Sequence, residues 1–267
     1  MNTGNVQQNW WITGAGAGLG RELALNLAAA GHRVYASSRS SSDLAALQSL
    51  YPALITPVPV DVSNTEAMTN LWTAMQDPPT CLHGIILSAG ICEYVDLPVL
   101  DEAVFRRVME VNFFGIVLAC KAALPLLYAA CRQNQPVKPR IVGIGSLSSC
   151  LGLPRAEAYG ASKAAMHYFL DSLRSDIGRD IAVTVVQPGF VATRLTAGND
   201  FSMPYLWSVE RAASHVFSKL WLDRTVIRFP WQLYLFMRLG NLFPDFWYRH
   251  VAPRLSRYRQ DGNTGSL

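Results

Sequence analysis

Cysteine is scarce in this chain, and its spacing excludes two kinds of site. The 267 residues include five cysteines, and no two of them form a Cys-x-x-Cys pair. An odd number at these spacings indicates neither a disulfide framework nor a zinc site, so we expect reduced thiols and no bound metal. The first eight residues also lack a basic cluster, and Thr13 and Gly14 interrupt the apolar stretch that follows. We therefore expect no secretory signal and a cytoplasmic protein.

Excess positive charge is confined to the last quarter of the chain. Residues 1–199 hold 14 basic and 14 acidic side chains, whereas residues 200–267 hold nine basic and five acidic ones. Six arginines of this last part alternate with aromatic residues: Arg228, Arg238, Arg249, Arg254, Arg257 and Arg259. Because they form no polybasic run, the pattern argues against nucleic acid and favours an anionic membrane surface or an acidic ligand.

Short β-branched runs alternate with longer helical patterns. The predicted strands are 10–13, 33–36, 55–58, 84–87, 140–144, 182–186 and 225–229, and the predicted helices are 19–30, 43–50, 65–75, 101–130 and 157–177. Because the strands mostly lack period-2 alternation, both of their faces should be covered. The series predicts a single α/β domain over residues 1–267, with a doubly wound parallel sheet of about seven strands and helices on both faces.

A glycine-rich turn with the sequence TGAGAGLG occupies residues 13–20, between the first strand and the first helix. A dinucleotide pyrophosphate can approach such a backbone and meet the helix N–H groups, because glycine has no side chain that would block it. The G-x-G-x-x-G fingerprint does not fit, since it would require glycine at Leu19 or Arg21. The pattern that fits is T-G-x-x-x-G-x-G, which also occurs in simple strand-to-helix connections.

Tyr159 and Lys163 stand four residues apart on a predicted helix, so their side chains project from the same face. The pKa of tyrosine is normally about 10, and a nearby ammonium group lowers it by favouring the phenolate. In isolation such a pair is usually a chance feature of a solvated helix. Ser146, however, follows strand 140–144, which places its hydroxyl at the carboxyl edge of the sheet, where ligands bind in open α/β folds.

These elements, in this order, resemble the short-chain dehydrogenase/reductase family across most of the chain. The family's cofactor turn is matched by Thr13, Gly14, Gly18, Leu19 and Gly20, its adenine-contacting pair by Asp61 and Val62, the end of its fourth strand by Ser88, Ala89 and Gly90, its catalytic tetrad by Asn112, Ser146, Tyr159 and Lys163, and its nicotinamide-side motif by Pro188, Gly189, Val191 and Thr193. Leu87 and Ser88 replace two asparagines of the family pattern. The hydroxyl of Ser88 must therefore provide the sheet-stabilising hydrogen bonds that an asparagine amide provides in the family.

The resemblance implies a Rossmann-like fold and hydride transfer to or from a nicotinamide cofactor. In that scheme Tyr159 exchanges a proton with the substrate oxygen, Ser146 hydrogen-bonds that oxygen, and Lys163 holds the nicotinamide ribose while lowering the tyrosine pKa. Asn112 would bind a water that continues the proton relay. Its alternative role is a helix-interior amide that bonds a backbone carbonyl. The resemblance also implies a homodimer or homotetramer, formed through the helices at 101–130 and 157–177.

Charge at the end of the second strand predicts the cofactor preference. A carboxylate there would bind the ribose of NAD and repel a 2′-phosphate, but this chain has Ser37, Ser38 and Arg39. A guanidinium and hydroxyls suit a 2′-phosphate, so we expect NADP(H) rather than NAD(H). Asp43 could be the missing acid, although it stands where a helix N-cap is expected. Arg39 could also be a solvated surface residue.

The last third of the chain is apolar and basic. Residues 190–221 predict a substrate lid, although packing against the sheet explains the same side chains equally well. Residues 230–260 predict a helical extension whose apolar stretch, bounded by Arg228 and Arg238, is too short to span a bilayer. Three roles are open for it: a peripheral helix on lipid, a flap over a lipophilic substrate, or an oligomer contact.

We therefore expect an NADP(H)-dependent carbonyl reductase or alcohol dehydrogenase with a hydrophobic substrate, such as a fatty acyl, steroid-like or other lipophilic ketone, aldehyde or alcohol. Two alternatives remain. A nucleotide-sugar epimerase or dehydratase would need glycine at Ala17 and a longer substrate region. A non-catalytic NAD(P)-binding sensor would keep the cofactor turn, but the intact set of Asn112, Ser146, Tyr159 and Lys163 argues against it.

Overall fold

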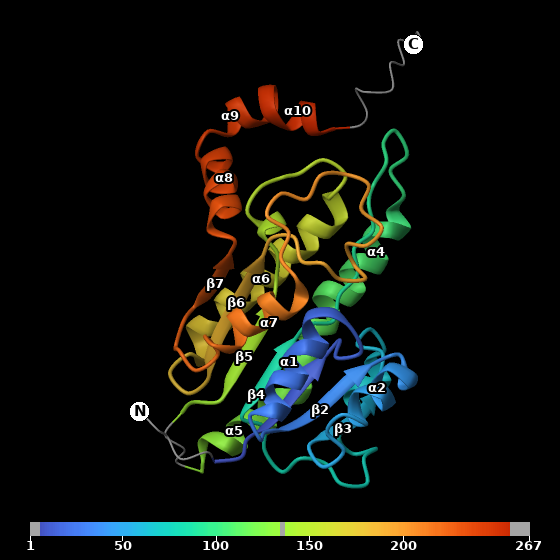
Figure 1. Cartoon of the computed structure of the whole chain (residues 1–267), viewed down its shortest axis with the longest axis vertical. Helices are drawn as coiled ribbons and strands as arrows, with labels where there is room; N and C mark the ends of the chain where they lie inside the picture. The colour runs from blue at the N-terminus through green and yellow to red at the C-terminus, as the bar shows by residue number, and fades with distance from the viewer. Residues whose placement is uncertain (1–5, 134–136, 257–267) are drawn as a thin grey trace.

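The computed structural model describes residues 6–133 and 137–256 (Figure 1). Its seven strands are β1 (Asn9–Thr13), β2 (Arg33–Ser38), β3 (Ile55–Pro59), β4 (Gly84–Leu87), β5 (Arg140–Ile144), β6 (Ala182–Pro188) and β7 (Val226–Phe229). They form one parallel sheet in the order β3-β2-β1-β4-β5-β6-β7, which confirms the predicted doubly wound architecture. The order reverses between β1 and β4, and ligands bind at such a switch point, beyond the carboxyl ends of the strands.

The strands form where the sequence allows both faces to be buried. Trp10 and Trp11 are adjacent in β1 and point to opposite faces, and each is fully buried in a different hydrophobic cluster. The strands β4, β5 and β6 are buried along their whole length and are mostly apolar, although Arg140, Thr184 and Gln187 are buried among their apolar residues. β3 lies at an edge of the sheet, which suits Pro57 and Pro59 because proline donates no hydrogen bond to a neighbouring strand.

Helices cover both faces of the sheet. The helices α1 (Gly18–Ala29), α2 (Ser41–Gln48) and α7 (Val209–Phe217) pack on one face, whereas α3 (Thr65–Thr69), α5 (Gly115–Cys131) and α6 (Glu157–Ile177) pack on the other. The predicted helix 65–75 is too long, because the chain turns after Thr69 and the indole of Trp72 donates to the carbonyl of Ala122 on α5.

The predicted helix 101–130 consists of three parts. A π-helical turn (Glu110–Phe114) separates α4 (Glu102–Met109) from α5. By length and composition alone, the continuous segment Glu102–Cys131 could cross a membrane. In this fold, Ile116, Ala123 and Leu127 of α5 are instead buried against the sheet, as in the core helix of an α/β domain.

Residues 209–221 do not belong to a substrate lid. They contain α7, which begins where the Ser208 hydroxyl accepts a hydrogen bond from the backbone N–H of Arg211. Ala212, Ala213 and Val216 of this helix are buried in the same cluster as α1. Their packing against the core therefore restricts the lid hypothesis to the loop at 190–207.

The predicted C-terminal extension forms an arm at one end of the molecule, at the top in Figure 1. It consists of α8 (Trp231–Leu242), α9 (Pro244–Phe246), a π-helical turn (Trp247–Val251) and α10 (Ala252–Leu255). Its inward side chains, among them Leu233, Met237 and Trp247, form a cluster with Leu147 and Leu151 from the loop after β5. Residues 257–260 of the predicted extension lie outside the described residues, as do Arg257 and Arg259.

Candidate active site

A cavity of about 510 Å³ lies along the carboxyl ends of the central strands. Its lining includes most of the residues that the sequence singled out: Gly14, Gly18, Leu19, Ser38, Arg39, Ser88, Gly90, Ser146, Tyr159, Lys163, Pro188, Gly189, Val191 and Thr193. Six others lie outside this lining: Thr13, Gly20, Asp61, Val62, Ala89 and Asn112. Apart from the Asp61-Val62 pair and Asn112, every motif that the sequence singled out therefore contributes residues to the lining of this cavity.

Thr13 and Asp61, two of the six residues outside the lining, form hydrogen bonds within the protein. Thr13 is buried, and its hydroxyl accepts hydrogen bonds from the backbone N–H groups of Ser88 and Ala89. The Asp61 carboxylate accepts hydrogen bonds from the backbone and the hydroxyl of Ser63. The assignment of Thr13, Gly20, Asp61, Val62 and Ala89 to the cofactor site stays a prediction.

The glycine turn fits a dinucleotide for two physical reasons. Gly14 has a φ of 69°, and a Cβ on it would lie 2.7 Å from the backbone nitrogen of Ala89, so no other residue allows this approach of the two loops. The helix α1 begins without a side-chain cap at Ala17 and has no acidic residue in its first turn. Its N–H groups are therefore suited to an anion such as a pyrophosphate.

Three candidate catalytic side chains converge on the cavity from two elements. Ser146 follows β5, and Tyr159 and Lys163 stand on α6. Lys163 is buried, and its Nζ atom donates a hydrogen bond to the carbonyl of Ile144 at 2.9 Å and lies 5.8 Å from the centre of the Tyr159 ring. Burial lowers the pKa of Lys163 to about 8. Its charge is therefore sensitive to mildly alkaline pH.

The surroundings of Tyr159 raise the pKa of its hydroxyl above the ordinary value for tyrosine. Burial raises the pKa of Tyr159, the neighbouring Cys92 thiol raises it further, and a hydrogen bond with Ser146 works in the opposite direction. Burial is the largest of these influences, and the expectation that Lys163 lowers this pKa stays a prediction. At neutral pH Tyr159 is consequently a proton donor.

Asn112 is fully buried at the π-helical turn between α4 and α5. Its Oδ1 atom accepts a hydrogen bond from the backbone of Ile91, and its Nδ2 atom donates to the carbonyl of Ile91 and to the hydroxyl of Ser162. The alternative role considered from the sequence is therefore the one observed. The binding of a relay water at Asn112 stays a prediction.

A salt bridge crosses one end of the cavity. Asp43 is not the N-cap of α2, since Ser40 occupies that position and its hydroxyl accepts a hydrogen bond from the Asp43 backbone. The Asp43 carboxylate instead pairs with Arg194 at 2.9 Å, and a hydrogen bond from this guanidinium lowers the pKa of Asp43. Arg39 lies exposed beside this pair, at the edge of the cavity. Sequence reasoning missed Arg194 because 151 residues separate it from Asp43.

Three loops are joined beside Tyr159. Arg155 forms ion pairs with Asp96 at 2.6 Å and Asp200 at 3.2 Å, and its guanidinium lies over the ring of Tyr94. The Tyr94 hydroxyl donates to the Asn199 side chain at 2.6 Å. The loop at 190–207 is thereby attached to the loop that follows β4, and no motif in the sequence indicated this contact.

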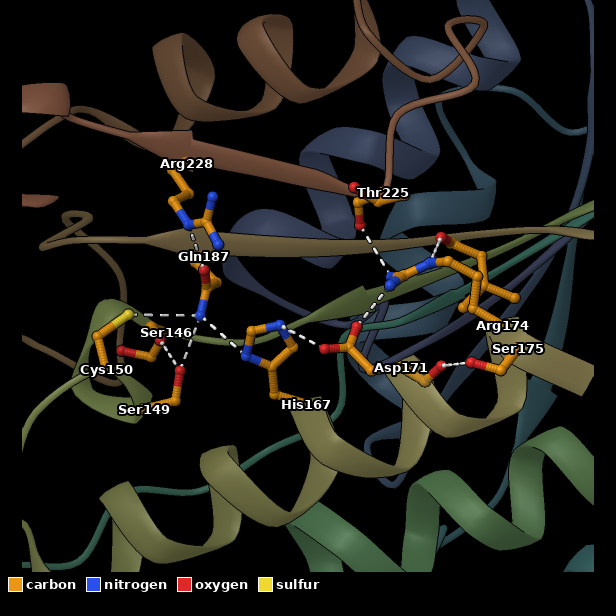
Figure 2. A network of polar contacts seen from close by, with 11 residues as sticks. Ser146, Ser149, Cys150, His167, Asp171, Arg174, Ser175, Gln187, Thr225 and Arg228 are labelled. Atoms are coloured by element: carbon orange, nitrogen blue, oxygen red, sulfur yellow. Dashed lines mark hydrogen bonds and ion pairs between the residues drawn. The ribbon is translucent and has the colours of Figure 1, made fainter. Parts of the chain in front are cut away.

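A polar network supports the loop that carries Ser146 (Figure 2). Gln187 of β6 is fully buried, and its amide nitrogen hydrogen-bonds the Ser149 hydroxyl and the Nδ1 atom of His167. The amide oxygen accepts from Arg228 of β7 at 2.7 Å. Ser149 in turn donates to the carbonyl of Ser146 at 2.7 Å. The position of the Ser146 loop therefore depends on β6, β7 and α6 together.

Known proteins share this sequence and this fold. The family model described as short chain dehydrogenase matches residues 8–201. A protein from Myxococcus xanthus named uncharacterized oxidoreductase is 33% identical over 248 residues, which cover 91% of this chain and 96% of that protein. The 11-beta-hydroxysteroid dehydrogenase A of Sesamum indicum is 32% identical over 196 residues, which cover 72% of this chain but only 54% of that protein.

Solved structures agree on the fold. A short chain dehydrogenase from Burkholderia cenocepacia in complex with NADP has a TM-score of 0.76 at 24% identity, with 94% of this chain and 98% of that chain covered. A short chain dehydrogenase/reductase from Burkholderia phymatum in complex with NAD has a TM-score of 0.79 at 20% identity, with 90% and 95% covered. Together with the sequence matches, this fold makes the chain an oxidoreductase of the short-chain dehydrogenase family, whose members bind NAD(P).

Proposed function

We propose that this oxidoreductase uses NADP(H) to interconvert a lipophilic ketone or aldehyde and the corresponding alcohol. The observation that carries the proposal is the single cavity lined both by the glycine turn and by Ser146, Tyr159 and Lys163. The cofactor, when bound, supplies or accepts the hydride. The protein must then bind the substrate oxygen and exchange a proton with it.

The side chains divide that task between them. Tyr159 keeps its proton at neutral pH and donates it to the substrate oxygen during reduction, while Ser146 hydrogen-bonds the same oxygen. Lys163 binds the cofactor ribose from the floor of the cavity. Asn112 fixes Ile91 and the start of the loop after β4, and its Nδ2 atom also donates to the Ser162 hydroxyl of α6.

Charge at the Arg39 end of the cavity supports NADP(H). Ser38, Arg39 and Ser40 line that end and offer hydroxyl and guanidinium donors. Asp43 also lines it, but its carboxylate is paired with Arg194. The acid that would otherwise bind a ribose hydroxyl and repel a phosphate is thus engaged elsewhere.

Apolar side chains near Tyr159 support a lipophilic substrate. The rings of Tyr94 and Phe190 both pack against Phe201, at centroid distances of 5.8 and 6.0 Å. Leu195 adds an apolar side chain to the lining of the cofactor cavity. The curated relatives include 11-beta-hydroxysteroid dehydrogenases at about 30% identity, which is consistent with a steroid-like or fatty acyl carbonyl compound.

Titration of NADPH and NADH against three proteins tests the cofactor proposal. We expect the wild type to prefer NADPH, and Arg39→Ala to weaken NADPH binding roughly tenfold to a hundredfold while NADH affinity stays the same, because one charge-assisted contact is lost. Arg33→Ala removes an exposed arginine at the opposite end of β2, the strand that precedes Arg39, and should change neither affinity. Equal affinities in the wild type, or an equal loss for both nucleotides in Arg39→Ala, would contradict the proposal.

A further inference from the structure

The helix α8 is apolar on both of its sides. Leu233, Met237 and Gly240 face inward and are buried. Residues on the opposite side, which follow one another at helical spacing, are apolar but exposed: Trp231 (67%), Leu235 (47%), Leu239 (49%) and Leu242 (66%). A solvated helix normally presents polar residues on this side, and a helix that is apolar all round is normally covered. We call these four residues the outer face of α8.

The exposed apolar surface continues along the arm. Phe243 and Phe246, which follow α8 directly, are 58% and 62% exposed. Isolated exposed apolar residues need no explanation, but a run of six large ones on a protruding segment marks an interaction surface. The arm stands at an end of the molecule, at the top in Figure 1, where α8 and the segment with α9 and α10 form its outer border.

The charge of the arm indicates the chemistry of that partner. Residues 231–256 contain Arg238, Arg249 and Arg254 but only one acidic residue, Asp245. All three arginines are exposed, and none forms an ion pair within the described residues 6–133 and 137–256. Helical spacing puts Arg238 on the outward side, between Leu235 and Leu242. An apolar face with unpaired arginines at its border suits an anionic interface.

A second copy of the chain fits this face less well. In a two-fold contact between outer faces, Arg238 of each copy would approach the other, and α8 offers no acidic side chain to separate them. A bilayer surface has no such conflict, because the arginine heads reach the lipid headgroups while tryptophan and leucine enter the region below them.

We propose that the outer face of α8, with Phe243 and Phe246, rests on a membrane surface rich in anionic lipid. The helix lies parallel to the surface and remains attached to the protein through Leu233 and Met237. This contact is independent of the cofactor preference, since neither Arg39 nor any other residue of the cofactor cavity takes part in it.

Co-sedimentation of the full chain with lipid vesicles tests the proposal. We expect the protein to bind vesicles of phosphatidylcholine mixed with phosphatidylglycerol, and to bind phosphatidylcholine alone much more weakly. Arg238→Gln should weaken binding to the mixed vesicles about fivefold at low salt, whereas Lys121→Gln, which removes one exposed charge from α5, should weaken it less. High salt should reduce the difference between the two vesicle types.

Two glutamate variants separate the outer face from apolar exposure in general. Trp231→Glu and Leu235→Glu alter exposed positions and should abolish vesicle binding, while NADPH affinity and thermal stability remain those of the wild type. Tyr168→Glu, at a residue of α6 that is 78% exposed, should bind vesicles like the wild type. Measuring NADPH affinity on the same samples keeps a failure of this proposal distinct from a failure of the cofactor assignment.

The proposal would be overturned if the wild type did not bind mixed vesicles, or if Trp231→Glu bound them as well as the wild type. It would also be overturned if sedimentation in lipid-free buffer showed a dimer that Trp231→Glu converts to a monomer. The outer face would then be a contact between two copies of the chain.

Discussion

Burial shifts the titration of Tyr159 and Lys163 toward their uncharged forms. Desolvation raises the pKa of the phenol and lowers that of the ammonium group to about 8. Proximity of the two residues along the helix therefore does not by itself create a tyrosinate at neutral pH, because the cost of burying charge acts on both partners.

The Tyr159 hydroxyl is the group whose removal should stop turnover. Tyr159→Phe should lower kcat by a factor of about 10² to 10⁴, the usual contribution of a positioned acid, and leave NADPH affinity nearly unchanged. Tyr168→Phe, on the exposed side of the same helix, is the matched control and should retain full activity. Steady-state kinetics with a lipophilic ketone decides the matter, and a fully active Tyr159→Phe enzyme would refute the assigned role.

The buried ammonium group of Lys163 predicts opposite pH trends for stability and activity. Its pKa is about 8 in the folded chain, whereas the ordinary value for a hydrated lysine is 10.5. Between these values the unfolded chain binds more protons, so the free energy of unfolding should rise with pH from about 8 to about 10. Over the same interval kcat/KM for reduction should fall, because the ribose contact loses its ammonium group.

Denaturant unfolding at several pH values measures the rise in stability, and pH–rate profiles measure the fall in kcat/KM. Lys163→Met should remove the rise in stability. Tyr159 has the opposite effect on stability at higher pH. Its pKa is raised on folding, so its contribution to stability is present below about 10 and is lost as the pH rises further. A stability that falls steadily from neutral pH upward would contradict the buried state of Lys163.

In the loop after β5, the hydroxyl of Ser149 contributes more to the position of the loop than the hydroxyl of Ser148. Ser149 both accepts from Gln187 and donates to the Ser146 carbonyl, whereas the buried Ser148 hydroxyl has no hydrogen-bond partner in the described part of the chain. Ser149→Ala should therefore cost about 1 kcal/mol of unfolding free energy and lower kcat, while Ser148→Ala should change little. Equal effects in both variants would show that the network does not position Ser146.

The sequence predicted elements well where burial follows from local pattern. All seven strands were found, because each contains a short run rich in apolar residues. The helix α7 was missed, although Ser208 as a cap and Ala212, Ala213 and Val216 at helical spacing were present, because the segment was interpreted as a lid. The overlong prediction at 65–75 has a different cause, since the end of that helix depends on where Trp72 finds a partner on α5.

The candidate site was predictable in its motifs but not in its long-range pairs. The glycine turn and the set of Ser146, Tyr159 and Lys163 meet in one cavity, as their positions after strands or on one helix face require. The partners of Asp43 and Gln187 are far away in the chain, at Arg194 and Arg228, and no local pattern indicates them. The raised pKa of Tyr159 likewise follows from burial, which only the assembled fold defines.

For the whole molecule, the C-terminal arm contributes stability through its inner side. Trp247 is 2% exposed, its indole packs on Phe236, and its Nε1 atom donates to the carbonyl of Gly152. Trp247→Ala should cost about 3–5 kcal/mol of unfolding free energy. Trp231→Ala removes the same side chain from an exposed position and should stay within about 0.5 kcal/mol of the wild type. Denaturant unfolding of both variants distinguishes the two sides, and similar losses would mean that the outer face is also buried.

The Asp43–Arg194 pair has a consequence for how long a cofactor stays in place. It connects α2 to the loop after β6 across one end of the cavity, the end that Arg39 also lines. Arg194 is 74% exposed and Asp43 29%, and an ion pair with a hydrated partner is screened by salt. The dwell time of the nucleotide should therefore shorten as the ionic strength rises.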